Sequence, residues 1–225
     1  MAAHRRRLAL IIHNVRSAHN VGSMFRTADG AGVEMIALSG YTPVPPEHGA
    51  VAMTAAQKSF RKTALGAEAS VAWKRFRTAA EAIGFFRKEG FGIAALEQRD
   101  GSISYDAYRP KGPVALIVGN EVLGIDRRIL DAADAVLEIP MHGKKNSLNV
   151  SVAAALFLYE AARQREAAGF YAQCRLPPAL YADTLFEWCY PEIAALCRAK
   201  SVAYPPLTAE GELGANPFSD SGRAP

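Results

Sequence analysis

The sequence has few cysteines and no long apolar run. Its 225 residues include three cysteines, Cys174, Cys189 and Cys197, whose spacing matches no zinc site. We interpret them as reduced, partly buried thiols. No window holds about 18 consecutive apolar residues, which excludes a transmembrane helix. The apolar run 8–12, which follows Arg5–Arg7, is too short for a secretory signal, so we expect a cytoplasmic protein with no membrane partner.

Several common catalytic signatures are also missing. A dinucleotide-binding fingerprint starting at Gly30 fails because Met35 stands where its third glycine should be. A P-loop ending at Lys144 would need glycine where Glu138 stands. The patterns Cys-x-x-Cys, His-Glu-x-x-His and Gly-x-Ser-x-Gly do not occur. Metalloproteases, zinc deaminases and serine hydrolases therefore have no support, and we expect no metal.

The composition is that of a globular protein with a modest basic excess. Half of the residues are apolar and 21% are charged, and the length corresponds to about 1.5 domains. The net charge is +4 and the pI is near 9.0. Basic surface attracts polyanions, so this balance permits a phosphate-bearing partner but does not establish one.

Apolar runs alternate with helical patterns along the first two thirds of the chain. Five short runs are expected to be strands, at 8–12, 35–38, 91–96, 114–118 and 135–139. Several are continuous rather than alternating, as in parallel strands that are covered on both faces. Helical patterns lie at 21–28, 78–89 and 148–159, the last with Ser147 as a possible N-cap. The sequence therefore predicts an α/β fold with a mostly parallel sheet flanked by helices.

The composition changes after Gly169. We expect a catalytic domain at 1–168 and a C-terminal extension at 169–225. The extension is expected to be helical to about residue 200, with Pro191 kinking or splitting the helix. A flexible tail containing proline and glycine is expected beyond it.

Three polar clusters each follow a predicted strand. They span residues 14–26, 119–124 and 139–149. Because ligands bind at the carboxyl ends of strands in open parallel sheets, the three clusters are expected to form one shared site.

Each cluster also has a simpler interpretation. Asn20 could cap the first helix, and Ser147 and Asn149 are ordinary helix-start residues. Arg26 and Lys144–Lys145 could be solvated surface groups, and Glu121 could be a carboxylate on a surface turn. No single cluster is specific by itself.

Taken together in order, the clusters resemble the SpoU/TrmH family of the SPOUT superfamily. The first motif of that family is matched by Asn20-Val-Gly-Ser-Met-Phe-Arg26 and the second by Gly119-Asn-Glu121-Val-Leu-Gly124. The third is matched by Ile139-Pro-Met-x-Gly143 through Ser147-Leu-Asn149. The resemblance covers roughly residues 6–166.

The resemblance implies an RNA ribose 2′-O-methyltransferase that uses S-adenosylmethionine and has a C-terminal trefoil knot. It implies two sets of site residues. The cofactor would be held near Leu96, Gly119, Ile139, Met141 and Leu148. The catalytic residues would be Arg26, Asn20, Glu121, Ser147 and Asn149.

The resemblance assigns Arg26 to catalysis, sometimes as the base. A guanidinium rarely gives up its proton, so a grip on the target phosphate and on the developing alkoxide suits it better. Asn20 and Glu121 would then orient Arg26 or the ribose. Ser147 and Asn149 would shape the substrate side.

The resemblance also implies a homodimer whose site is completed across the interface, through the first helix and the helix that begins at Leu148. The RNA partner would be tRNA or rRNA, with tRNA slightly favoured. Phosphate contacts would come from Arg5–Arg7, the basic stretch 58–62, Lys144–Lys145 or the C-terminal extension. Alternatives are a non-catalytic RNA-binding relative and a methyltransferase acting on a small molecule or a protein.

Overall fold

The computed structural model describes residues 7–47, 52–172, 176–208 and 210–214. The chain forms two compact units, residues 1–170 and 171–225. Among the residues discussed above, Arg5, Arg6, Cys174 and the end of the expected tail lie outside the described ranges.

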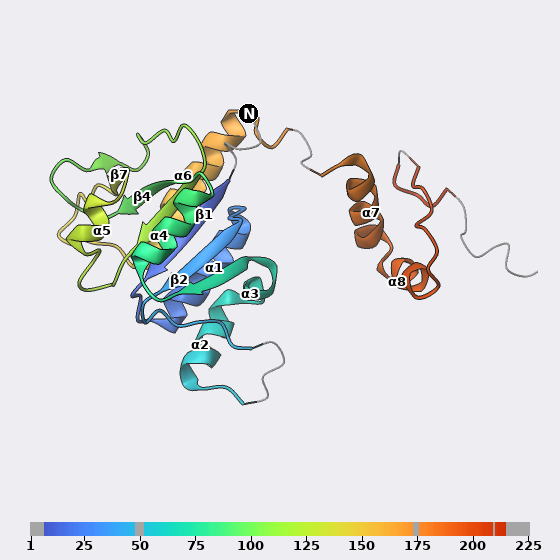
Figure 1. Cartoon of the computed structure of the whole chain (residues 1–225), viewed down its shortest axis with the longest axis horizontal. Coiled ribbons are helices and arrows are strands. Elements are labelled where there is room, and N and C mark those ends of the chain that lie inside the picture. The colour runs from blue at the N-terminus through green and yellow to red at the C-terminus, as the bar shows by residue number, and fades with distance from the viewer. Residues whose placement is uncertain (1–6, 48–51, 173–175, 209, 215–225) are drawn as a thin grey trace, which may run out of the picture. The chain divides into compact units, whose positions relative to one another are not determined.

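The first unit is built on a parallel sheet of seven strands (Figure 1). The strand order is β3-β2-β1-β6-β4-β7-β5, and every neighbouring pair is parallel. The strands are β1 Leu8–His13, β2 Met35–Ser39, β3 Ala72–Phe76, β4 Gly92–Leu96, β5 Ile103–Ser104, β6 Val114–Val118 and β7 Ala135–Glu138.

All five predicted runs are strands, and two further strands were not predicted. These are β3 and β5, which lie at the two edges of the sheet. Edge strands need no continuous apolar run, because they have a neighbouring strand on one side only and their side chains are less fully covered. β3 exposes Trp73, Lys74 and Arg75, and β5 has only two residues.

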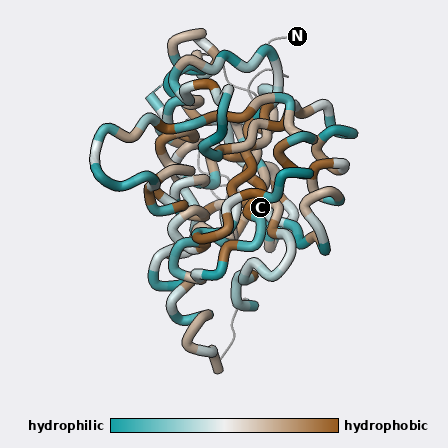
Figure 2. Tube along the Cα trace, turned by 90° about the vertical axis from the view of Figure 1, so that its left-hand side faces the viewer, coloured by the Kyte–Doolittle hydropathy of each residue, from teal (hydrophilic) through white to brown (hydrophobic). Residues whose placement is uncertain are grey.

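Helices cover both faces of the sheet (Figure 1). The helices of this unit are α1 Ala18–Gly30, α2 Ala55–Ala64, α3 Ala67–Ser70, α4 Ala79–Lys88, α5 Arg127–Asp131 and α6 Val150–Ala167. One apolar cluster joins Leu10 and the other β1 residues on its face to α1, α2 and α6. The second cluster joins Ala9 and Ile11, on the opposite face of β1, to α4. Figure 2 shows hydrophobic stretches (brown) interspersed with hydrophilic ones (teal) along the chain. The predicted α/β fold is confirmed, whereas the trefoil knot stays a prediction.

Gly22, in the first sequence motif, lies where α1 touches α2. A Cβ at position 22 would overlap the carbonyl oxygen of Phe60 and the Oγ1 of Thr63. The same Thr63 hydroxyl donates a hydrogen bond of 2.9 Å to the carbonyl oxygen of His19. This glycine therefore serves the packing of two helices rather than chemistry.

We expect Gly22→Ala to lower the free energy of unfolding by about 1–3 kcal/mol, because α2 must shift to admit the methyl group. The matched control is Gly84→Ala in α4, where a Cβ meets no atom within 4 Å. That control should be stabilising by about 0.5–1 kcal/mol, since alanine favours a helix. Urea titrations followed by circular dichroism measure both. Equal effects would contradict the packing role.

The start of α6 differs from expectation, and most of its apolar stripe lies on the outer face. Asn149, not Ser147, is the N-cap. The buried face of the helix is formed by Ala154, Phe157 and their neighbours, not by the predicted apolar stripe. Most of the stripe points outward, with exposed fractions between 37% and 55% for Leu148, Val152, Leu156 and Tyr159.

Arg7 is also placed differently from the RNA-contacting role suggested for it. Its guanidinium pairs with the carboxylate of Glu34 at 2.8 Å and with that of Glu89 at 3.6 Å. It also lies 4.6 Å from the ring centre of Phe91. These partners hold Arg7 in the fold, so it is not a free phosphate ligand.

The second unit contains the helices α7 Pro178–Cys189 and α8 Pro191–Ala199. Phe186 of α7 is buried and stacks on Tyr204, with 4.8 Å between the ring centres. Cys189 is exposed, Cys197 is buried, and both are free thiols. Trp188 exposes 80% of its surface.

Candidate active site

The three polar clusters meet at the carboxyl edge of the sheet. They follow β1, β6 and β7, while β4 lies between β6 and β7. Adjacent parallel strands end at the same edge, so the loops that follow them converge. The predicted convergence is reflected in hydrogen bonds between residues that are about a hundred positions apart.

The carboxylate of Glu121 joins the second cluster to the first. It accepts the backbone N–H of Arg16 at 3.0 Å and that of Ser17 at 3.1 Å. It also accepts the Nδ2–H of Asn20 at 3.2 Å. Both carboxylate oxygens are thereby occupied by donors from the start of α1.

These donors determine the charge of Glu121. Burial alone would raise the pKa of its carboxyl group, but the N–H groups of Arg16 and Ser17 and the amide of Asn20 together bring that pKa below its usual value. The carboxylate is therefore ionised at neutral pH. The stability it contributes is complete above its unfolded pKa of about 4.3 and is lost as the pH falls through the lower folded value. A carboxylate held by three donors is poorly suited to act as a general base.

Asn20 joins these two clusters to the third. Its Oδ1 accepts the Nδ2–H of Asn149 at 3.2 Å. Asn149 in turn caps α6, since its Oδ1 accepts the backbone N–H of Ser151 at 2.8 Å. The alternative that Asn20 caps α1 is wrong, because Ser17 is the N-cap and accepts the N–H of Asn20. We call Asn20, Glu121 and Asn149 the central network.

Arg26 does not join the central network within one subunit. Six residues along a helix correspond to a rise of about 9 Å and a rotation of about 240° from Asn20. The Arg26 side chain is exposed. It has no hydrogen bond or ion pair with any residue that the structure describes. The hypothesis that Asn20 and Glu121 orient Arg26 is therefore wrong for contacts inside a single subunit.

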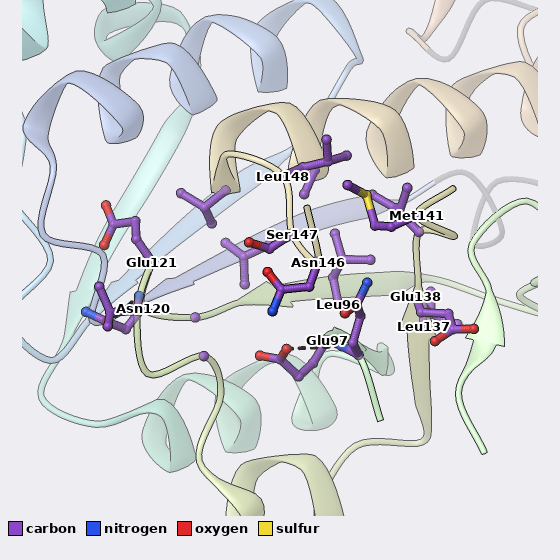
Figure 3. A pocket seen from close by; sticks show the side chains of 18 residues that line it. Leu96, Glu97, Asn120, Glu121, Leu137, Glu138, Met141, Asn146, Ser147 and Leu148 are labelled. Carbon is purple, nitrogen blue, oxygen red and sulfur yellow. Dashed lines mark hydrogen bonds between the residues drawn. The ribbon is translucent and has the colours of Figure 1, made fainter. Parts of the chain in front are cut away.

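A cavity of about 360 Å³ lies beside the central network. All five residues predicted to hold the cofactor line it: Leu96, Gly119, Ile139, Met141 and Leu148. Of the predicted catalytic residues, Glu121 and Ser147 also line the cavity, whereas Asn20, Arg26 and Asn149 do not. Figure 3 shows Leu96 and Glu97 on one side of Asn146 and Ser147.

Asn120 shapes the wall of the cavity that follows β6. Its Oδ1 accepts the backbone N–H of Val122 and that of Leu123, at 2.8 and 2.9 Å. Its Nδ2–H group donates to the carbonyl oxygen of Asn14 and to the hydroxyl of Tyr41, both at 2.9 Å. Sequence reasoning gave Asn120 no role, although it lies between two residues that were singled out.

Two chemical properties distinguish the cavity. Residues 139–148 donate or accept no backbone hydrogen bond with the described part of the chain, so their polar groups can receive a ligand. Glu97, Glu121 and Glu138 line the cavity, and no Lys, Arg or His is among the described lining residues. A cavity with apolar walls, open backbone groups and three carboxyl groups suits a flat, hydrogen-bonding ligand with positive charge.

The described residues contain no group of three His, Cys, Asp or Glu side chains that could hold a metal ion. Within the same residues, no helix has both the length and the apolar character required to span a membrane.

Residues 7–159 match the model of the SpoU rRNA methylase family, and residues 163–216 match that of the SpoU rRNA methylase C-terminal region. The chain belongs to the SpoU rRNA methylase family. The resemblance carried by the three sequence motifs is thereby confirmed, and each motif lies within the first matched segment.

Relatives with assigned activities are similar over most of their length. The tRNA (guanosine(18)-2′-O)-methyltransferase of Escherichia coli is 34% identical over 211 residues, which are 93% of this chain and 87% of that enzyme. The enzyme of the same name from Thermus thermophilus is 35% identical over 181 residues, which are 80% of this chain and 87% of that enzyme.

Solved structures show the same fold. The TrmH/SpoU tRNA modifying enzyme of A. aeolicus is 29% identical with a TM-score of 0.64, covering 85% of this chain and 93% of that one. The AdoMet-bound rRNA methyltransferase of Sinorhizobium meliloti is 28% identical with a TM-score of 0.62. That match covers 70% of this chain and 56% of the larger enzyme.

Proposed function

We propose that this protein transfers a methyl group from S-adenosylmethionine to a ribose 2′-hydroxyl of tRNA. The observation that carries the proposal is the central network beside the cavity, because it joins all three family motifs in one place. The names of the Escherichia coli and Thermus thermophilus relatives favour tRNA over rRNA. We further propose that the protein acts in the cytoplasm.

The cavity fits S-adenosylmethionine by its chemistry. Leu96, Ile139, Met141 and Leu148 provide apolar walls for the adenine. The open backbone groups of 139–148 can pair with the polar edge of that ring. The cofactor carries a sulfonium and an ammonium group against one carboxylate, so the three lining carboxyl groups favour its net positive charge.

The bound cofactor would supply an electrophilic methyl group, and the protein would align the ribose hydroxyl with it. The central network sets the relative positions of α1, the turn after β6 and α6. Ser147 and Asn149 would shape the ribose side. Arg26 would grip the target phosphate and stabilise the developing alkoxide, because a guanidinium presents paired donors and keeps its proton.

We propose that the protein is a homodimer whose interface is the outward face of α1 and α6. The two helices run side by side, since Asn20 contacts Asn149 at their starts and Gly30 lies against the Tyr159 hydroxyl further along. The outward stripe of α6 continues this face and is apolar. Exposed apolar patches on soluble proteins commonly mark such interfaces. Arg26 lies on the same helix pair, so a second subunit could complete the site.

Leu156→Glu tests the interface. Placing a charge in the apolar stripe should give a monomer in sedimentation velocity and abolish methyl transfer, while S-adenosylmethionine still binds. The control is Leu65→Glu at the end of α2, which is 65% exposed and lies on another helix. It should leave the dimer intact. An active Leu156→Glu monomer would exclude this interface.

The charges of the two units favour RNA binding by the first. Residues 1–170 contain 22 Lys and Arg against 16 Asp and Glu, whereas residues 171–225 contain 4 against 6. Phosphate contacts therefore belong to the first unit, where 58–62 and Lys144–Lys145 are the proposed contacts. We keep residues 1–168 as the proposed catalytic domain. We keep the extension 169–225 as a separate proposed domain.

The function is tested by binding and by methyl transfer. Isothermal titration should show one S-adenosylmethionine per subunit, and tritiated methyl should enter tRNA but not protein or small-molecule acceptors. Mapping the product should place the label on a ribose 2′-oxygen, and a transcript with deoxyribose at that position should accept none. No heat with S-adenosylmethionine, together with RNA binding, would instead identify a non-catalytic RNA-binding relative.

A further inference from the structure

We infer that Glu97 is a positioning residue that latches the turn 119–125 onto the end of β4 and so sets the shape of the cofactor cavity. The inference rests on the proposed function, because that function identifies the cavity as the cofactor site. Its first test does not depend on that function. Neither the sequence motifs nor the family resemblance singles out Glu97.

The contacts of Glu97 are those of a latch. It is the first residue after β4, and its Oε2 accepts the backbone N–H of Ile125 at 3.0 Å. Its Oε1 accepts the backbone N–H of Gln98 at 3.0 Å. One carboxylate thus joins the end of β4 to the far end of a turn 28 residues away.

The turn itself is built to meet this carboxylate. Gly124 has a φ of +66°, and a Cβ there would overlap Oε2 of Glu97. Gly119 faces it from the other arm, since a Cβ there would lie 2.5 Å from the Gly124 carbonyl oxygen. Asn120 and Gly124 exchange backbone hydrogen bonds of 3.1 and 3.0 Å. Only glycine at 119 and 124 lets the turn close against Glu97.

The latch connects the cavity to the central network. Glu121 lies in the middle of the turn that Glu97 holds, and it carries the contacts to α1 and Asn20. If the far arm of the turn opens, the cavity wall formed by Gly119 and Gly124 moves with it. Glu97 therefore acts on the cofactor through the turn, although its carboxylate also lines the cavity.

The first test needs no ligand. Amide hydrogen exchange followed by mass spectrometry should show at least about tenfold faster exchange in the 119–125 peptide of Glu97→Gln. In the unmodified protein the N–H groups of Gln98 and Ile125 each bind a separate oxygen of the Glu97 carboxylate. A glutamine side chain has only one acceptor oxygen, so one of these two N–H groups loses its partner. The matched control is Glu166→Gln, an exposed residue of α6, which should leave that peptide unchanged. Unchanged exchange in Glu97→Gln would overturn the latch.

The second test separates the latch from a direct charge contact. The latch predicts that Glu97→Gln weakens binding of the neutral product S-adenosylhomocysteine about tenfold, and binding of S-adenosylmethionine by at least that factor. A direct contact between carboxylate and sulfonium predicts a loss for S-adenosylmethionine alone, and this would overturn the inference. If the unmodified protein binds neither molecule, the proposed function fails, while the exchange experiment still decides the latch.

A double-mutant cycle provides a further check. Gly124→Ala should loosen the same turn, because its methyl group displaces the Glu97 carboxylate. In the double variant Glu97→Ala/Gly124→Ala, the fold-loss of cofactor affinity should be smaller than the product of the fold-losses in the two single variants. Both substitutions remove the same contact, so their effects should not multiply. Independent, multiplying losses would contradict a shared role.

Discussion

Arg26→Lys is expected to lower methyl-transfer turnover about 100- to 1,000-fold, the range found when a transition-state donor is removed. Lysine keeps the positive charge but loses the planar pair of donors that grips a phosphate. Arg26 does not line the cavity, so the dissociation constant for S-adenosylmethionine should not change. Single-turnover assays with tritiated cofactor measure the first quantity and isothermal titration the second.

The matched control is Arg77→Lys, whose side chain is 87% exposed and lies before α4. It should methylate tRNA as the unmodified protein does. Unchanged turnover in Arg26→Lys would remove Arg26 from the mechanism. A loss of cofactor binding in the same variant would show that Arg26 supports the cavity instead.

Glu121→Ala is expected to cause the other large effect, a loss of turnover of at least about 100-fold with a modest loss of stability. Removing the carboxylate leaves the N–H groups of Arg16 and Ser17 and the amide of Asn20 without their acceptor. Because the site is partly solvated, we expect about 1–2 kcal/mol less free energy of unfolding. Turnover falls further, since Asn20 and Asn149 lose the group that orients them.

Urea titration and single-turnover kinetics measure these two effects, with Glu166→Ala on the outer surface of α6 as the control. A stability loss without a change in turnover would mean that the central network serves folding alone. The pH dependence gives a second measurement. The difference in stability between the unmodified protein and Glu121→Ala should be largest above about pH 4.3 and shrink at lower pH.

The isolation of Arg26 within one subunit also allows a mixing experiment. Arg26→Lys and Glu121→Ala each lack one part of the site, and a dimer with one copy of each has one site with both parts intact if Arg26 acts across the interface. Random mixing should then restore about a quarter of the unmodified activity. No recovery on mixing would place Arg26 and Glu121 of the same subunit in one site.

Local patterns predicted much of this structure. The five strands that lie between the two edge strands were predictable from the sequence, because strands covered on both faces need continuous apolar runs. The convergence of the three polar clusters followed from the rule that parallel strands end at one edge. The five residues expected to hold the cofactor line one cavity for the same reason. A stricter use of that rule would also have found Glu97, which directly follows a predicted strand.

Other features depend on contacts that no local pattern contains. Asn20 looked like a helix cap until its partners, 101 and 129 positions away, were known. The outward direction of the α6 stripe and the separation of Arg26 from Glu121 arise in the same way. Sequence periodicity states which residues share a face, and motif spacing states which loops follow strands. Which faces are buried, and which donors meet which acceptors, is decided only when distant segments pack together.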